Sequence, residues 1–160
     1  MPEPSYAQSP DDFRLDEIAR MSGLEMLQGI IDGRVFAPPI ARTLGYRLAE
    51  VSSGRAVFRG VASFDYMNPS GVVHGGWYGT LLDSCMACAV LTRLAAGQAQ
   101  TTLEYKINII RPVPEGMEVD AIGEAQHVGR STGVASGRLV GVSDGRVYAT
   151  GSTTLIVMGG

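Results

Sequence analysis

The run from Trp77 to Ala96 constrains the fold more than any other stretch of this sequence. It contains no proline and is rich in Ala, Leu and Met, and Gly97 follows it, where a helix C-terminal cap is common. The pattern therefore predicts one long helix. Because the run is apolar on nearly all sides, we expect this helix to be buried rather than to lie on a surface.

A single acid, Asp83, lies in the middle of this run among Leu81, Leu82 and Met86. A carboxylate on an apolar helix requires a hydrogen-bonding partner, a proton or a chemical role. The other charged residue, Arg93, is expected in the last turn, where a cation suits the helix dipole. Asp83 is therefore a candidate catalytic residue, and the structural alternative is a buried acid that binds backbone N–H groups.

A glycine-rich segment precedes the predicted helix. Gly71, Gly75 and Gly76 let the backbone come close to a ligand, and a helix N-terminus offers unpaired N–H groups to an oxygen atom. His74 adjoins these glycines, and two interpretations of it stay open. It either fixes the loop by hydrogen bonds or takes part directly in the chemistry.

The rest of the domain has the pattern of strands around this helix. The expected strands span about 44–51, 55–63, 103–109, 117–128, 132–142 and 146–158. Leu103, Tyr105, Ile107 and Ile109 alternate with polar residues, which predicts one buried face and one polar face. An α+β fold satisfies this order, with one antiparallel six-stranded sheet wrapped round a single long central helix.

The N-terminal part of the chain is expected to be simpler. Residues 1–14 carry three prolines with Ser and Asp, and they predict a flexible tail. Ser22 and Glu25 form a capping-box pattern, so a short helix is expected there, ending near Gly33. An Ala-Pro-Pro connector after it is expected to be extended. Residues 15–160 are then expected to form a single domain.

Composition argues against several classes of function. The 160 residues carry a net charge of −3 with no block of like charge, which gives no support to nucleic-acid or basic membrane binding. No apolar run reaches the roughly 20 residues of a membrane span, and the N-terminus lacks the regions of a signal peptide. We therefore expect a soluble, cytoplasmic protein.

Two motifs suggest other chemistry, but neither has the required context. The segment 129–133 matches the nucleophile elbow of serine esterases, yet a strand follows it and no histidine lies beyond His127. Cys85 and Cys88 are spaced like a redox pair or half of a zinc site, but they lie in mid-helix without two further ligands. We expect a turn and two buried thiols, with no metal and no cofactor.

Around the central helix the sequence resembles the hot-dog fold acyl-CoA thioesterases of the phenylacetate-pathway (PaaI) type. The resemblance rests on Asn68-Pro-x-Gly-x-Val-His74-Gly75-Gly76, on Asp83 nine positions after His74, and on Thr102-x-Glu-x-x-Ile-Asn followed by Arg111-Pro112. It covers about residues 40–158. It implies hydrolysis of an acyl-CoA thioester to a carboxylic acid and free CoA.

The resemblance also implies a role for individual residues. Asp83 falls on the catalytic carboxylate, as nucleophile or as general base for water, and Gly75 falls on the backbone N–H that polarises the thioester carbonyl. Asn68 orients substrate or water, His74 is the loop histidine, and Thr102 supports the carboxylate or the water. Strand alternation alone points Thr102 away from the helix, so its contact with Asp83 requires a bulge.

For the substrate, the resemblance implies contacts of Ser131 and Thr132 with the pantetheine arm, and Gly76 is a further candidate for binding the substrate or its CoA. The resemblance also makes Arg111 and Arg130 candidates to bind the CoA phosphates. The acyl group is not readable from the sequence, although the candidates for an apolar pocket suit an aromatic and a medium-chain group equally. These candidates are Met67, Trp77, Tyr78 and Met86.

Gly75 and Asp83 are eight residues apart, roughly 12 Å along a helix, too far to reach one carbonyl group. A homodimer that faces Gly75 of one copy with Asp83 of the other resolves this, and the family often pairs its dimers into tetramers. Two alternatives stay open at this point: a hot-dog hydratase or dehydratase of acyl thioesters, and a non-catalytic acyl-CoA-binding protein.

Overall fold

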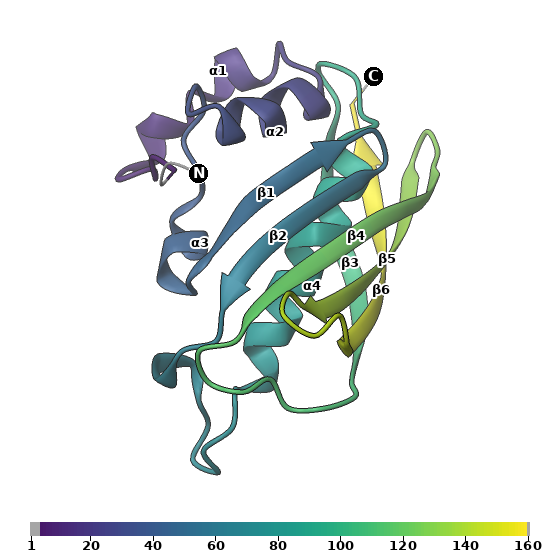
Figure 1. Cartoon of the computed structure of the whole chain (residues 1–160). Helices are drawn as coiled ribbons and strands as arrows, with labels where there is room; N and C mark the ends of the chain where they lie inside the picture. The colour runs from purple at the N-terminus through teal and green to yellow at the C-terminus, as the bar shows by residue number, and fades with distance from the viewer. Residues whose placement is uncertain (1–3, 160) are drawn as a thin grey trace.

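A computed structural model describes residues 4–159 of the chain (Figure 1). Its strands are β1 (Tyr46–Ser52), β2 (Arg55–Val61), β3 (Ala99–Ile109), β4 (Glu118–Val128), β5 (Thr132–Gly141) and β6 (Val147–Met158). Its helices are η1 (Pro10–Phe13), α1 (Leu15–Ile18), α2 (Gly23–Ile31), α3 (Pro39–Thr43), η2 (Phe64–Tyr66) and α4 (Gly75–Leu91). No helix in this described part is long and apolar enough to cross a bilayer.

Within residues 4–159, the six strands form one antiparallel sheet in the order β1-β2-β4-β5-β6-β3. The sheet curves round α4, which contacts all six strands (Figure 1). The expected α+β hot-dog arrangement is therefore confirmed, and β1 and β3 are the two edges of the sheet.

The core lies between α4 and the concave face of the sheet. Leu81, Leu82 and Met86 are fully buried there, as is Cys85. Gly123 of β4 brings the sheet close to the helix, since a Cβ at this position would overlap the Cys85 carbonyl group. Small residues on both surfaces thus permit a close approach that larger side chains would prevent.

Helix α4 ends at Leu91, earlier than the predicted end near Ala96. The C-terminal cap is Thr92, whose Oγ1 donates a hydrogen bond to the Ala89 carbonyl at 2.6 Å. A side chain that bonds the backbone in this way competes with continuation of the helix. Arg93, expected in the last turn, therefore lies beyond the helix.

The apolar side chains of β3 are not buried as the alternating pattern predicts. Leu103 is 60% exposed, Tyr105 47% and Ile109 46%. Topology explains the difference, because β3 is an edge strand that pairs with β6 on one side. Opposite Tyr105 and Ile109, helix α4 presents Gly79 and Gly75, which cover little surface. The apolar side chains of Tyr105 and Ile109 are therefore left exposed beside the helix.

The N-terminal segment packs against the domain. Residues 4–14 were expected to belong to a flexible tail, but they make defined contacts. The Ala7 N–H donates to the Ala37 carbonyl at 3.0 Å, the Ala37 N–H donates to the Ser5 carbonyl at 2.8 Å, and Ala7 is buried. Residues 1–3 of the expected tail lie outside the described residues. Backbone pairing with the connector after α2 holds this segment in place.

Helix α2 begins as its sequence predicts. The Glu25 N–H donates to Ser22 Oγ at 3.3 Å, and the Glu25 carboxylate accepts the Ser22 N–H at 2.8 Å. The bond from the Ser22 backbone is the main cause that lowers the pKa of Glu25. The Ala-Pro-Pro connector is not extended throughout, because Pro39 begins α3, and proline suits the first turn of a helix.

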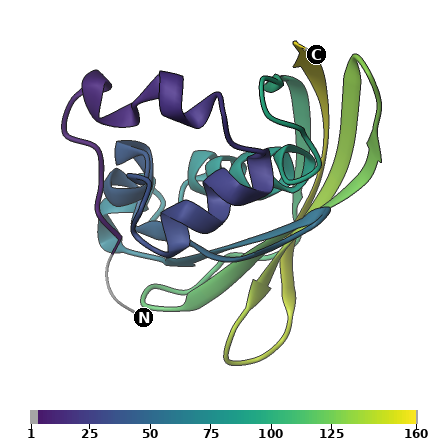
Figure 2. The ribbon, with the colours of Figure 1, turned by 90° about the horizontal axis from the view of Figure 1, so that it is seen from above.

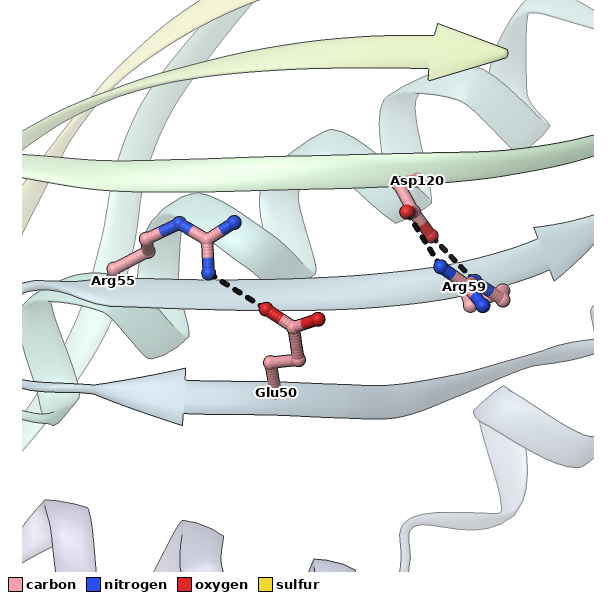
Figure 3. A network of polar contacts seen from close by, with 4 residues as sticks. All are labelled: Glu50, Arg55, Arg59 and Asp120. Atoms are coloured by element: carbon pink, nitrogen blue, oxygen red, sulfur yellow. Dashed lines mark hydrogen bonds and ion pairs between the residues drawn. The ribbon is translucent and has the colours of Figure 1, made fainter. Parts of the chain in front are cut away.

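Two cross-strand ion pairs tie the first strands of the sheet together (Figure 3). Arg59 of β2 donates to both oxygens of Asp120 in β4, at 2.7 and 2.8 Å, and Arg55 donates to Glu50 of β1 at 2.9 Å. The hydrogen bond to Asp120 raises the pKa of Arg59 above its ordinary value. A bidentate pair of this kind also fixes the register of the two strands.

Candidate active site

The turn before α4 presents a backbone N–H group at Gly75. His74 is the N-cap, and its Nδ1 accepts the Gly76 N–H at 2.9 Å, while the His74 N–H donates to the Tyr66 carbonyl at 2.7 Å. His74 thus fixes the turn by hydrogen bonds. The Gly75 N–H binds no acceptor among residues 4–159. One donor at the positive end of the helix dipole is therefore available to a substrate oxygen.

Asn68 shapes the loop that leads into this turn. Its Oδ1 accepts the Ser70 N–H at 2.9 Å, and its backbone N–H donates to the Val72 carbonyl at 2.8 Å. Gly71 follows with a φ of 72°, a left-handed conformation that favours glycine. The side-chain oxygen of Asn68 is occupied within its own loop, so the side-chain N–H groups are the part that can contact a substrate.

Asp83 is half-buried in the middle of α4 and accepts a hydrogen bond from Thr102 Oγ1 at 2.9 Å. The pairing of β3 with β6 shifts register between Thr102 and Glu104. This bulge breaks the alternation and turns Thr102 toward the helix. The contact between Thr102 and Asp83, which was expected only if the strand contains a bulge, is therefore present.

Further polar groups flank the Asp83–Thr102 pair. Gln100, two residues earlier in β3, donates to a carbonyl of α4 one turn beyond Asp83, and its Oε1 is buried without a hydrogen-bond partner among the described residues. On the other side, the Tyr46 hydroxyl lies 3.2 Å from Ser84 Oγ. Burial is the main cause that raises the pKa of Tyr46, and the Asp83 charge adds to the rise. Sequence reasoning missed these three residues, although the position of Gln100 in the strand of Thr102 was an available signal.

The fold does not bring Gly75 and Asp83 together within one chain. Both lie on the continuous helix α4, eight residues apart. At about 1.5 Å of rise per residue they are separated by roughly 12 Å along the axis. A single thioester carbonyl cannot contact both groups of the same chain.

The candidates for CoA binding lie near opposite ends of α4. Arg111 lies near the N-terminal end, since neighbouring Val113 donates its N–H to the Tyr78 hydroxyl at 2.7 Å. The segment 130–132 is exposed in the turn between β4 and β5, and β5 then begins beside Val90 in the last turn of the helix. One chain therefore does not gather Arg111, Arg130, Ser131 and Thr132 into one site.

The segment 129–133, which matches a nucleophile elbow, and the pair Cys85 and Cys88 both occupy structural positions in the fold. The Gly129 N–H donates to the Thr132 carbonyl at 2.8 Å, which closes a turn into a strand rather than an elbow into a helix. Burial raises the pKa of the Cys85 thiol, and it raises that of Cys88 to about 12. Among the described residues, no group of three or more His, Cys, Asp and Glu side chains is placed to hold a metal ion.

A family model described as the thioesterase superfamily matches residues 70–155, more than half of the chain. This chain belongs to the thioesterase superfamily. The matched segment includes the turn at Gly75, helix α4 with Asp83, and the strand that carries Thr102. The expected thioester hydrolase activity is confirmed at the level of the family.

The solved structures similar to this thioesterase include proteins of the PaaI type. The phenylacetic acid degradation protein PaaI of Thermus thermophilus, in a mutant form, is 27% identical with a TM-score of 0.67, over 74% of this chain and 97% of that one. A phenylacetic acid degradation-related protein of Ralstonia eutropha is 28% identical with a TM-score of 0.74, over 82% and 98%. A thioesterase family protein of Silicibacter pomeroyi is 27% identical with a TM-score of 0.71, over 76% and 90%. No curated protein matches the chain.

The apolar residues expected to line an acyl pocket mostly belong to the core. Tyr78 and Met86 are fully buried, and Trp77 is 3% exposed. Met67 and Trp77 border an open cleft beside His74, but Tyr78 and Met86 do not. A more enclosed apolar cavity lies instead beneath the N-terminal helices. No sequence pattern indicated this cavity, because its walls come from several segments that are far apart in the sequence.

Proposed function

We propose that this thioesterase hydrolyses an acyl-CoA thioester to a carboxylic acid and free CoA. The observation that carries the proposal is the 2.9 Å hydrogen bond from Thr102 to Asp83, which holds a half-buried carboxylate in one orientation on an apolar helix. Thioester hydrolysis needs such a carboxylate and a donor for the developing oxyanion, and the backbone N–H of Gly75 supplies the donor. The similarity to proteins named for phenylacetic acid degradation adds support.

In the general-base form of the mechanism, Asp83 takes a proton from water while the water oxygen bonds to the thioester carbon. The carbonyl oxygen becomes an oxyanion, which the Gly75 N–H stabilises. The C–S bond then breaks, and the CoA thiolate receives the proton from Asp83. In the nucleophilic form, the carboxylate itself bonds to the carbon, CoA leaves, and water hydrolyses the resulting anhydride. Rapid-quench mass spectrometry distinguishes them, because only the anhydride adds an acyl group to Asp83.

We further propose that each site is shared between two copies of the chain. In a two-fold homodimer, Gly75 and Asn68 of one protomer face Asp83 of the partner subunit. The oxyanion donor and the carboxylate, which lie roughly 12 Å apart within one chain, can then reach the same thioester carbonyl group. The exposed apolar side chains of Tyr105 and Ile109 on the edge strand β3 support this arrangement. Exposed apolar surface on an unpaired edge is typical of a face that another chain covers. Two such dimers are expected to pair into a homotetramer.

Substrate contacts follow from the same arrangement. In an antiparallel pair of α4 helices, the N-terminal end of one lies beside the C-terminal end of the other. Arg111 of one protomer and Arg130 of the other then converge on the CoA phosphates. Gly76 with Ser131 and Thr132 contacts the pantetheine arm, while His74 keeps the turn in place.

The test is release of free CoA from a panel of acyl-CoAs, measured with a thiol dye. Asp83→Asn keeps the shape of the side chain but removes the base, so we expect kcat to fall at least about a hundredfold. Near-normal turnover in this variant would remove Asp83 from the mechanism. Hydration of crotonyl-CoA without CoA release would instead identify an acyl-thioester hydratase, and binding without turnover a non-catalytic acyl-CoA-binding protein.

A further inference from the structure

An apolar cavity of about 230 Å³ lies between the N-terminal helices and the C-terminal half of α4. In Figure 2 these helices, purple to blue, lie on one side of α4, and the strands curve round its other side. An engineered apolar cavity of roughly 150 Å³ binds benzene, so this one has room for a short alkyl chain. Its walls include Met26, Ile30, Phe36, Leu48, Cys88 and Leu91.

Helix α2 is fixed over this cavity by direct contact with the end of α4. The Gly23 N–H donates to the Leu94 carbonyl at 3.0 Å, and a Cβ on Gly23 would overlap the Leu91 carbonyl. The Gly97 N–H donates to the Ala19 carbonyl at 2.9 Å, which ties the segment before α2 to the same end. Protein interiors hold few voids larger than a water molecule, so a space of this size under a fixed cover suggests a binding site.

The cavity meets α4 about one turn beyond the catalytic carboxylate. Ser84 follows Asp83, and Cys88 lies four residues after Ser84, on the same side of the helix. Cys88 borders the cavity. Burial is the main cause that raises the pKa of Cys88 to about 12, as expected for a thiol at an apolar wall. Asp83 and Cys88 are roughly 7.5 Å apart along the axis and about 140° apart round the helix, so a chain that joins them crosses the face of α4 between them.

We propose that this cavity holds the distal end of an aliphatic acyl chain while its thioester lies at Asp83, and that the cavity sets the acyl length the enzyme accepts. The inference rests on the proposed function, because a thioester at Asp83 is what directs the tail toward Cys88. A medium-length alkyl chain is long enough to span the roughly 7.5 Å of axial separation between Asp83 and Cys88. An apolar tail suits walls that are almost entirely hydrocarbon.

The polar exception in the wall is Arg47, whose Nε is buried without a hydrogen-bond partner among the described residues. Arg47 also borders an open polar pocket beside Arg42 and Arg59, so its side chain separates that surface from the cavity. An acyl tail ending in a carboxylate would pair with Arg47. The substrate panel therefore includes adipoyl-CoA beside hexanoyl-CoA.

The experiment measures kcat/KM for acetyl-, butanoyl-, hexanoyl-, octanoyl-, decanoyl- and adipoyl-CoA in the full chain. Cys88→Phe fills the cavity, so the ratio of octanoyl-CoA to acetyl-CoA activity is expected to fall at least about tenfold, since one methylene in an apolar pocket is worth about that factor. Leu91→Ala enlarges the cavity and is expected to move the optimum to a longer chain. Val142→Phe adds the same ring at an exposed site outside the cavity and is expected to keep the wild-type length profile.

Loss of activity that is equal for every chain length in Cys88→Phe, with an unchanged length profile in Leu91→Ala, would overturn the inference. Thermal unfolding shows whether each variant folds, and if Cys88→Phe does not, the direction of the shift in Leu91→Ala decides. A tenfold preference for adipoyl-CoA over hexanoyl-CoA would overturn the aliphatic assignment. If the wild type releases CoA from none of these substrates, the proposed function itself fails.

Discussion

The hydrogen bond between Thr102 and Asp83 gives the sharpest single-residue prediction. Thr102→Val keeps the branched shape of the side chain and removes the hydroxyl that donates to the carboxylate at 2.9 Å. A hydrogen bond to a charged group contributes about 1.5–3 kcal/mol. Because about 1.4 kcal/mol corresponds to a tenfold change in rate, kcat/KM is expected to fall by roughly ten- to 150-fold. The assay is steady-state CoA release with one good acyl-CoA substrate.

Two matched variants isolate the hydroxyl group. Thr101→Val makes the same replacement at the neighbouring residue, which is exposed, and is expected to keep wild-type rates. Thr102→Ser retains a hydroxyl and is expected to recover most of the activity lost in Thr102→Val. Wild-type kcat/KM in a folded Thr102→Val protein would refute the claim that this bond orients the catalytic carboxylate.

Two further predictions concern packing and pH. Gly123→Ala places a Cβ against the Cys85 carbonyl, so the free energy of unfolding is expected to fall by about 1–3 kcal/mol in urea titrations, and an unchanged midpoint would contradict the close approach. Burial raises the pKa of Cys85, which is fully buried, and that of half-buried Cys88 to about 12, so a thiol dye at pH 8 is expected to label Cys85 only after unfolding and Cys88 much more slowly in the native protein than after unfolding. Because the folded pKa lies above the ordinary value of about 8.5, this contribution to stability is complete below that pH and is lost as pH rises toward 12. Rapid labelling of native protein at pH 8 would contradict this burial.

The sequence predicted the central helix, the six strands and the position of Asp83, because these depend on local patterns. It misplaced the end of α4, since the residues after Leu91 are compatible with a helix. The Thr92 hydroxyl bonds the Ala89 carbonyl locally, but it also accepts the Gly54 N–H, a tertiary contact that no local pattern predicts. It also predicted that the apolar face of β3 is buried. That outcome depends on strand order, which places β3 at an edge, and alternation within one strand carries no information about order.

The candidate site also combines features that the sequence indicated with features that depend on the folded chain. Family resemblance pointed to Asp83 and Thr102, but periodicity alone opposed their contact, and a bulge that no local pattern announces brings them together. The Gly75 N–H, which binds no acceptor among residues 4–159, begins α4 after its N-cap His74, and the glycine-rich segment suggested such a donor. The cavity beside Cys88 was beyond prediction, because separate N-terminal segments close over it only in the folded chain.

Complementation between two inactive variants tests the shared site most directly. Gly75→Pro removes the proposed oxyanion donor at the first position of α4, where proline is tolerated, and His74 already has the extended conformation that precedes a proline. Asp83→Ala removes the carboxylate. Each variant alone is expected to be inactive, and random mixing of equal amounts is expected to restore about a quarter of wild-type sites, because half of the dimers then carry one intact site. No recovery in mixtures shown to contain mixed dimers would contradict an active site shared between two chains.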